Sequence, residues 1–154
     1  MQIHVGGVYE DKEAAMARFV ARYKKLPRVI KKRLAIENDD YLYSLQDCLQ
    51  LHELLKIPVI FDVFHHACNN HGEEIREAIE LAGKTWKKSD GILMMDYSSQ
   101  RKNARKGTHT EHINLRNFEN FIRQTKGLKF DLMLEIKDKE KSAIKAKELL
   151  KKIS

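Results

Sequence analysis

The sequence predicts an α/β fold of about five parallel strand-helix units, either an open sheet or a partial (β/α) TIM barrel that has five of the usual eight units. Apolar segments of strand length alternate five times with segments of helical spacing, as in proteins with a parallel sheet. The apolar segments are non-polar at nearly every position, as expected for strands that are buried on both faces. The chain has 154 residues and no linker-like stretch, so residues 1–154 are expected to form a single domain. A closed barrel would need eight such units.

The first two units span the N-terminal third of the chain. Gln2–Gly6 reads as a strand, and Asp11–Leu26 reads as a helix because its apolar residues recur at helical spacing. Arg33–Glu37 is the second strand. Ser44 can accept a hydrogen bond from the first turn of a helix that runs to Lys56, which makes it the expected N-cap.

The third and fourth units follow the same order. Pro58–Phe61 is strand-like, with proline at the first position, where it disturbs pairing least. Glu73–Gly83 carries an apolar stripe at helical spacing and ends at a glycine, the expected C-cap. Gly91–Met95 is the fourth strand. The polar, basic stretch Ser98–Ile113 reads as a long loop, after which Asn114 is expected to cap the next helix.

The fifth unit is the strand Lys129–Glu135 followed by a lysine-rich helix over Asp138–Ile153. The chain as a whole carries a net charge of +7, which favours a polyanionic partner such as nucleic acid. Cys48 and Cys68 lack the spacing of a metal clip or a disulfide scaffold, which favours a reducing, cytoplasmic compartment. No apolar run approaches the roughly 20 residues that a bilayer requires, so no membrane partner is expected.

Each predicted strand carries, or ends in, a residue that can bind a divalent cation. These residues are His4, Glu37, Asp62 with the nearby His65, Asp96 and Glu135. The carboxyl ends of all strands in a parallel barrel face one rim, where active sites lie. Converging carboxylates repel one another, and divalent cations relieve that repulsion and activate water. Mixed imidazole and carboxylate ligands suit Mn²⁺, Zn²⁺ or Fe²⁺ rather than Ca²⁺.

Other interpretations of single residues remain open. An acidic residue after a strand, such as Asp62 or Asp96, is commonly a helix cap or a turn residue. His4 can be a hydrogen-bonded core histidine. Glu37 and Glu135 fit these alternatives less well, because Glu is a poor cap. The recurrence of the pattern on five strands is what favours a metal site.

The loop Ser98–Ile113 is expected on the same rim. It contains four basic residues suited to DNA phosphates, namely Arg101, Lys102, Arg105 and Lys106. It also contains His109, which can reach a further metal ion. The alternative is an ordinary solvated run of charges.

Taken together, these motifs resemble the UV damage endonucleases. The likeness covers nearly the whole chain to about Lys141. It rests on His-Val-Gly-Gly from His4, Leu-Ala-Ile-Glu-Asn-Asp-Asp from Leu34 to Asp40, Ile57 to His66, Ser98-Ser99 with the later Gly-Thr-His109, and Asp131 to Glu135. The residues would form the C-terminal portion of such a barrel.

The resemblance implies an enzyme that cuts double-stranded DNA 5′ to ultraviolet photoproducts with the help of divalent ions, typically manganese. It implies that His4, Glu37, Asp62, His65, His109 and Glu135 are metal ligands. Among these, Glu37, Asp62 and Glu135 are the expected catalytic carboxylates, and Glu37 would bridge two ions.

Two departures from the family pattern modify this expectation. Asp96 stands where the family has His, and Met94 stands where it has Lys. Asp96 can still bind a hard ion, whereas the lysine function is lost. The chain also begins at what resembles the fourth barrel strand, so two further histidine ligands are expected to be missing. Activity of the isolated chain is therefore expected to be weak or nil. Its open edges should be covered by self-association or by a partner segment.

Two other functions remain possible on the sequence alone. A xylose-isomerase-like sugar isomerase or epimerase also places acidic residues and histidines at barrel strand ends, although the basic loop favours DNA over a neutral sugar. A non-catalytic barrel remnant would keep the scaffold and metal binding without the reaction.

Overall fold

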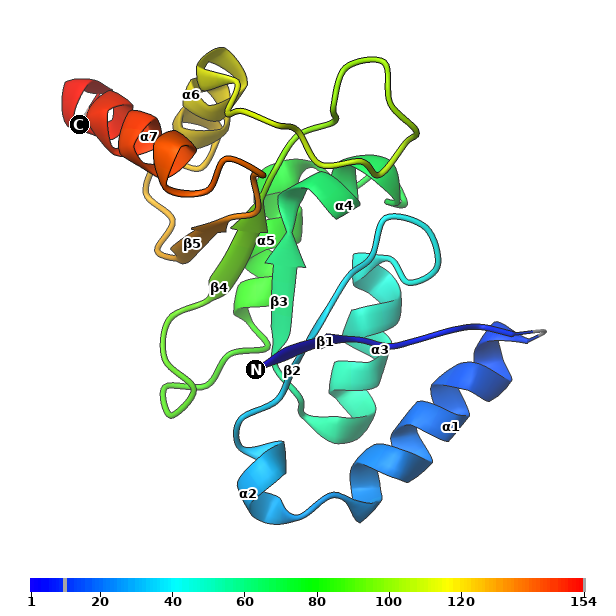
Figure 1. Ribbon diagram of the computed structural model, residues 1–154. Helices are drawn as coiled ribbons and strands as arrows, with labels where there is room; N and C mark the ends of the chain where they lie inside the picture. Colours follow the sequence, from blue (N-terminus) through cyan, green and yellow to red (C-terminus); the bar gives the residue numbers. More distant parts are fainter. Residues whose placement is uncertain (10, 154) are drawn as a thin grey trace.

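The computed structural model describes residues 1–9 and 11–153 and confirms the α/β class. One sheet of five parallel strands has the order β1-β2-β3-β4-β5, so each strand pairs with the next along the chain. The strands are β1 (Gln2–His4), β2 (Ala35–Glu37), β3 (Val59–Asp62), β4 (Met94–Tyr97) and β5 (Asp131–Leu134). The helices are α1 (Lys12–Lys25), α2 (Arg28–Lys31), α3 (Leu45–Leu55), α4 (Val63–Cys68), α5 (Ile75–Gly83), α6 (Leu115–Gln124) and α7 (Glu140–Ile153) (Figure 1).

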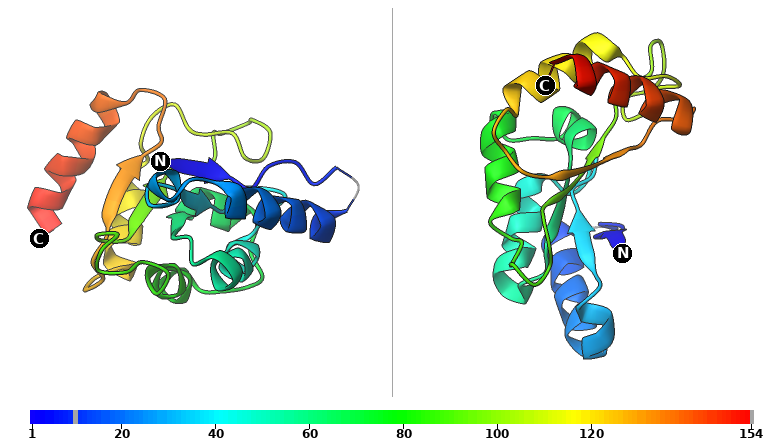
Figure 2. Two further views of the ribbon diagram at one scale, coloured as in Figure 1. Left: turned by 90° about the horizontal axis from the view of Figure 1, so that it is seen from below. Right: turned by 90° about the vertical axis from the view of Figure 1, so that its left-hand side faces the viewer.

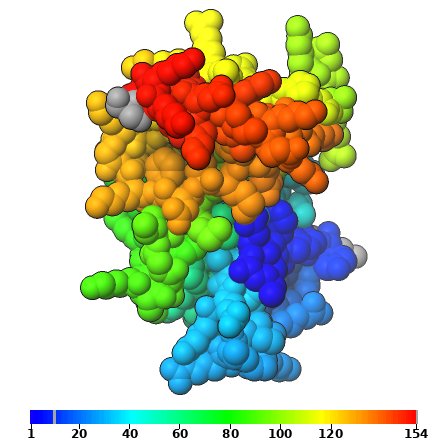
Figure 3. Space-filling model, turned by 60° about the vertical axis from the view of Figure 1, so that its left-hand side comes forward, coloured from blue at the N-terminus to red at the C-terminus, as the bar shows by residue number. Residues whose placement is uncertain are grey.

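The two faces of the sheet differ. Helices α3 and α5 pack against β2 and β3 on one face, and no described helix covers the other face (Figure 2). A hollow of about 940 Å³ lies at the amino ends of the strands, where Gln2, Ile60, Met94 and Met133 line it together with residues of α1, α2 and α3. Residues from both ends of the chain are exposed on the uncovered side of the sheet, blue and orange in Figure 3. The arrangement is a barrel wall with an open interior.

The hydrophobic core lies between the sheet and the helices. Ile36, Phe61 and Met95 from the three central strands are fully buried, as the continuous apolar runs predict. Phe118 of α6 packs edge-on against Tyr97, with ring centroids 5.1 Å apart. This packing fixes α6 over the end of β4 and keeps the central strands, which carry the site, in register.

Most helix starts agree with the sequence prediction. The side chains of Asp11, Ser44 and Asn114 each accept a backbone hydrogen bond at the starts of α1, α3 and α6. Gly83, predicted as a C-cap, lies inside α5, and Lys84 in a right-handed conformation ends that helix. The fourth strand begins at Met94 rather than at Gly91, because Gly91 has a φ of +100° that is incompatible with a strand.

The short helices α2 and α4 were not predicted, since each is too short to show helical periodicity in the sequence. Cys48 and Cys68 are both free thiols. None of the described helices combines the length and apolar character that a bilayer-spanning segment needs.

Candidate metal centre

The strand register brings the predicted ligands to one end of the sheet. His4 pairs with Glu37 across β1 and β2, and Asp62 pairs with Asp96 across β3 and β4. Glu135 follows the last residue of β5, and its backbone N–H donates to the carbonyl of Tyr97 at 2.9 Å. Parallel strands with this register place all five carboxyl ends at one rim, as the sequence predicts.

Glu37, Asp62 and His65 form the centre of the site. Each offers a ligand atom, and these atoms all lie within 4.8 Å of one another in a buried position. The Nδ1 atom of His65 is 3.3 Å from Oε1 of Glu37 and 3.5 Å from Oδ2 of Asp62. Two carboxylates and an imidazole at this spacing match the ligand chemistry of a transition-metal site.

Further predicted ligands surround this centre. Nε2 of His4 lies 3.8 Å from Oε2 of Glu37, and the ring centroid of His109 lies 5.6 Å from that of His65. The Nδ1 atom of His109 is also 3.8 Å from Oε2 of Glu135 and 2.9 Å from the Glu135 carbonyl oxygen. A continuous chain of contacts therefore links His4 to Glu135 through the central group.

Asp96 joins the group through a residue that the sequence did not single out. The side-chain amide of Gln2 donates to Oδ2 of Asp96 at 2.8 Å and to Oε2 of Glu37 at 3.1 Å. Gln2 lies two positions before His4, so alternation along the strand places both side chains on the same face. The structure thus brings together all seven predicted ligands.

Asp62 shows that the cap interpretation and the ligand interpretation are compatible. Its Oδ1 atom accepts the backbone N–H groups of Phe64 and His65 at 2.7 Å, which makes it the N-cap of α4. Its Oδ2 atom is buried and accepts no hydrogen bond within residues 1–9 and 11–153, although Nδ1 of His65 lies 3.5 Å away. Oδ1 of Asp96 is also buried and accepts no hydrogen bond in the same residues. Unpaired buried carboxylate oxygens are costly, and a bound cation would remove that cost.

The electrostatics are those of crowded carboxylates. Burial, reinforced by the charges of Glu37 and Glu135, raises the pKa of Asp96 to about 7 and that of Asp62 to about 6. Burial opposes protonation of His65, but its hydrogen bond to Glu37 and the charge of Asp62 outweigh burial and raise its pKa to about 9. In the absence of a metal ion the site therefore retains protons, which a divalent cation would displace.

The basic loop lies above this rim and is held in shape by Gln100. The Gln100 side chain donates to the carbonyls of residues 101, 104 and 105 and accepts the N–H of Gly107. Gly107 has a φ of +84°, a backbone conformation that other residues adopt only with strain, so glycine is favoured at this position. Arg101, Lys102, Arg105 and Lys106 are all exposed, although Arg101 also forms a 3.1 Å ion pair with Glu111.

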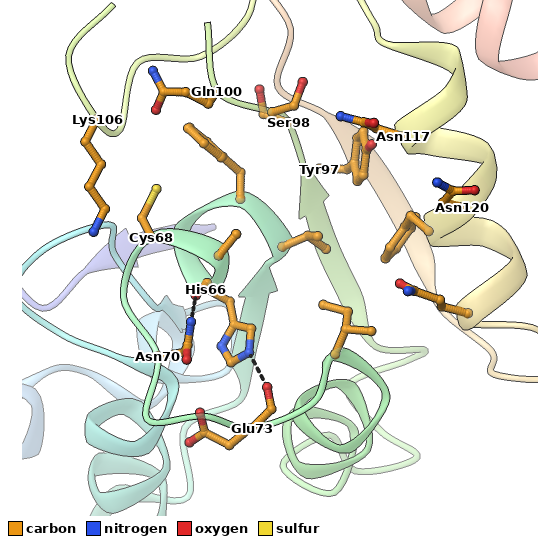
Figure 4. Close-up of a pocket in the computed structure, with 17 residues that line it drawn as sticks. His66, Cys68, Asn70, Glu73, Tyr97, Ser98, Gln100, Lys106, Asn117 and Asn120 are labelled. Atoms are coloured by element: carbon orange, nitrogen blue, oxygen red, sulfur yellow. Dashed lines mark hydrogen bonds between the residues drawn. The ribbon is translucent and has the colours of Figure 1, made fainter. Parts of the chain in front are cut away.

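A second hollow, of about 640 Å³, opens between α4, α5 and α6 on the helical side (Figure 4). Tyr97, Asn117 and Asn120 line it together with His66, which hydrogen-bonds to the Glu73 carbonyl. Of the predicted site residues only Lys106 borders it. The predicted ligands belong to the opposite, concave side of the sheet.

Asn38 is another residue of the site that the sequence did not single out. It is completely buried and hydrogen-bonds to the backbone of Asp62. An Asn directly after a strand is usually read as a turn residue, so the sequence offers only its position next to Glu37 as a signal.

Three comparisons with known proteins point to the same family. The model of a protein family described as UV-endonuclease UvdE matches residues 1–154. A UV DNA damage endonuclease of Clostridium perfringens is 42% identical, and the match covers 99% of this chain and 37% of the relative's length. A UV DNA damage endonuclease of Bacillus mycoides is 35% identical, and the match covers 91% of this chain and 45% of that relative's length. The crystal structure of SacUVDE superposes with a TM-score of 0.92 at 45% identity, covering 99% of this chain and 51% of that one. The chain thus spans less than half the length of these curated relatives.

Proposed function

The chain belongs to the UV-endonuclease UvdE family, and on that premise we propose that it acts in DNA repair as a metal-dependent endonuclease. Its substrate would be double-stranded DNA that carries ultraviolet photoproducts, and the cut would fall 5′ to the lesion. The observation that carries the proposal is the convergence of seven ligand-type side chains, five from strand ends, one from α4 and one from the basic loop, in a chain that matches this family along its whole length.

The ligand set fits one or more divalent cations. Glu37, Asp62 and His65 would form the central site, and His4, Asp96, His109 and Glu135 would complete its surroundings. Carboxylate and imidazole donors suit Mn²⁺, Zn²⁺ or Fe²⁺, and Mn²⁺ is the ion that the family resemblance implies. When bound, such an ion supplies the charge that activates water and stabilises the phosphate in the transition state.

The protein residues have distinct roles in this proposal. Glu37, Asp62 and Glu135 are the catalytic carboxylates. Glu37 is the best placed to bridge two ions, because its two oxygens face different partners, His65 on one side and His4 with Gln2 on the other. His65 stays close to both central carboxylates and can hold a proton when no ion is bound.

The loop residues Arg101, Lys102, Arg105 and Lys106 would contact the DNA backbone. They are exposed on the same rim as the ligands, and a cluster of basic side chains on a loop suits phosphate contacts. Such contacts position a duplex without reading its sequence, which suits an enzyme that recognises damage. The family match favours this substrate over the neutral sugar of an isomerase.

We also propose that a second copy covers the open side of the sheet, with a partner segment as the alternative. In the residues that the structure describes, β1 and β5 each lack a neighbour on one side, and Met133 on β5 is 42% exposed. Unpaired strand edges and exposed apolar side chains favour association. Analytical ultracentrifugation over a range of concentrations tests this, and a monomer at every concentration would contradict it.

The nuclease proposal is tested by incubating irradiated and unirradiated supercoiled plasmid with the protein in Mn²⁺ or in EDTA. We expect slow nicking that needs both irradiation and Mn²⁺ and is abolished by Glu37→Gln. The matched control is Glu53→Gln, a change of the same kind at an exposed residue that forms an ion pair with Lys56. Nicking that survives Glu37→Gln would refute the assigned site. Binding of Mn²⁺ and DNA without any cutting would instead identify a non-catalytic remnant.

A further inference from the structure

Asn38 directly follows Glu37 in the sequence and contacts the two other central ligands. It hydrogen-bonds to the backbone of Asp62 and lies against the side chain of His65. Its side chain has no exposed surface. We propose that Asn38 is a positioning residue that sets the geometry of Glu37, Asp62 and His65 for a divalent cation. This inference rests on the metal site proposed above, and it assigns a role to a residue that itself donates no ligand atom.

The first part of this role is a clamp between two strands. The backbone pairing of β2 with β3 is recorded up to Glu37 and Ile60. Beyond that point, Nδ2 of Asn38 donates to the Asp62 carbonyl at 3.0 Å, and Oδ1 of Asn38 accepts the Asp62 N–H at 2.9 Å. The carboxamide thus replaces a peptide group and extends the pairing to the ligand residue itself. Because Glu37 and Asn38 are adjacent, the clamp fixes Glu37 relative to Asp62.

The second part transmits this placement to His65. Asp62, held by the clamp, accepts the backbone N–H of His65 and thereby fixes the first turn of α4. The carbonyl oxygen of Asn38 lies 3.0 Å from Nδ1 of His65 and restrains rotation of the ring. One residue therefore determines both where α4 begins and how its histidine is turned. Residues outside a metal's ligand set that orient its ligands commonly change metal affinity by about 10- to 100-fold.

The chemistry of the site requires a carboxamide here. The Asp62 N–H needs an acceptor and the Asp62 carbonyl needs a donor, and both are buried. A side chain of similar volume without polar atoms, such as leucine, would leave both groups unpaired. An aspartate would set a negative oxygen against the carbonyl and add a charge to an already acidic site, so it would confuse the measurement.

A control is available at the first residue of β3, Val59, because Asp62 is the last residue of that strand. Thr85 is as well buried as Asn38, and its Oγ1 atom accepts the N–H of Val59 at 2.9 Å while donating to the Ala82 carbonyl. Thr85→Val removes an equally buried polar anchor of β3 far along the strand from the ligands. A general loss of stability would affect both variants, whereas a positioning role belongs to Asn38 alone.

The test compares Asn38→Ala and Asn38→Leu with Thr85→Val by titrating Mn²⁺ calorimetrically and by recording the visible spectrum of bound Co²⁺. We expect both Asn38 variants to bind Mn²⁺ about 10- to 100-fold more weakly and to show a changed Co²⁺ spectrum. Thr85→Val should keep the wild-type affinity and spectrum even if it melts earlier. Wild-type affinity in the Asn38 variants, or an equal loss in Thr85→Val, would overturn the proposal.

A measurement without metal completes the test. Amide hydrogen exchange of Asp62 and His65 should become at least tenfold faster in Asn38→Ala and stay unchanged in Thr85→Val. Unchanged protection of these two amides in Asn38→Ala would overturn the proposal even if the chain bound no metal. Neither measurement depends on DNA nicking. Both would therefore decide the role of Asn38 even if the chain bound Mn²⁺ without cutting DNA.

Discussion

Replacing Asp96 by Asn should affect folding and metal binding in opposite directions. Asp96 has no exposed surface, and its Oδ1 atom has no hydrogen-bond partner in the described part of the chain. Its Oδ2 atom accepts a hydrogen bond from the neutral amide of Gln2. Asn has nearly the same shape but no charge. It should therefore relieve the cost of an unpaired buried carboxylate and, at the same time, remove an anionic metal ligand.

The magnitude follows from the raised pKa. Burial raises the pKa of Asp96 from an ordinary value of 3.8 to about 7, which corresponds to roughly 4 kcal/mol of preference for the neutral form. We expect Asp96→Asn to recover about 2 kcal/mol of this above pH 7, because the new amide must also be accommodated in a buried place. For a chain of this length that gain raises Tm by about 4–8 °C. Below about pH 3 the gain should vanish, because Asp96 is then neutral in both the folded and the unfolded state.

The assay is thermal unfolding at pH 8 in EDTA and in Mn²⁺, followed by circular dichroism. In EDTA the variant should melt later than the wild type. In saturating Mn²⁺ the order should reverse or the gap should close, because the variant is expected to bind the ion at least tenfold more weakly. A variant that melts earlier in EDTA would refute the reasoning about the unpaired carboxylate. Unchanged Mn²⁺ affinity would remove Asp96 from the ligand set.

Three further predictions concern other parts of the molecule. Because its pKa is raised to about 9, protonated His65 stabilises the fold fully below pH 6.5, and this contribution is lost as the pH rises through 9. Tm in EDTA should therefore fall between pH 6.5 and 9.5, and a flat profile of Tm against pH would contradict this. Replacing the four basic loop residues (Arg101, Lys102, Arg105, Lys106) by Ala should weaken DNA binding, measured by fluorescence anisotropy. The slope of log K against log salt concentration should decrease in magnitude by up to about 3–4. An unchanged slope would indicate that the loop is solvated and does not contact DNA. Phe118→Ala should lower the free energy of unfolding in urea by about 3–5 kcal/mol, and a loss below about 1 kcal/mol would mean that the Tyr97–Phe118 contact does not hold α6.

Much of the fold was predictable because its signals are local. Apolar runs such as Val59–Phe61 and helix caps such as Ser44 depend on a few neighbouring residues and were placed correctly. The errors lie in a segment too short to show helical periodicity and at a single backbone conformation, neither of which the pattern of apolar residues reveals. Helix α4 starts because Asp62 caps it, and the fourth strand starts late because of the conformation of Gly91.

The candidate site was predictable to the extent that strand ends carry it. Parallel strands of known order must bring Glu37, Asp62 and Asp96 to one rim, so their proximity follows from the sequence. The supporting contacts do not follow in the same way. The roles of Gln2 and Asn38 depend on side-chain geometry between strands that lie 24 to 94 residues apart in sequence. Neither amide has a sequence pattern that distinguishes it from an ordinary polar residue.

The most direct test of the account is an anomalous difference map from a crystal of the protein grown with MnCl₂. We expect a manganese peak coordinated by Glu37, Asp62 and His65. Manganese found only at surface carboxylates, with these three side chains in contact with one another and with no ion between them, would contradict the assignment of this rim as a metal centre.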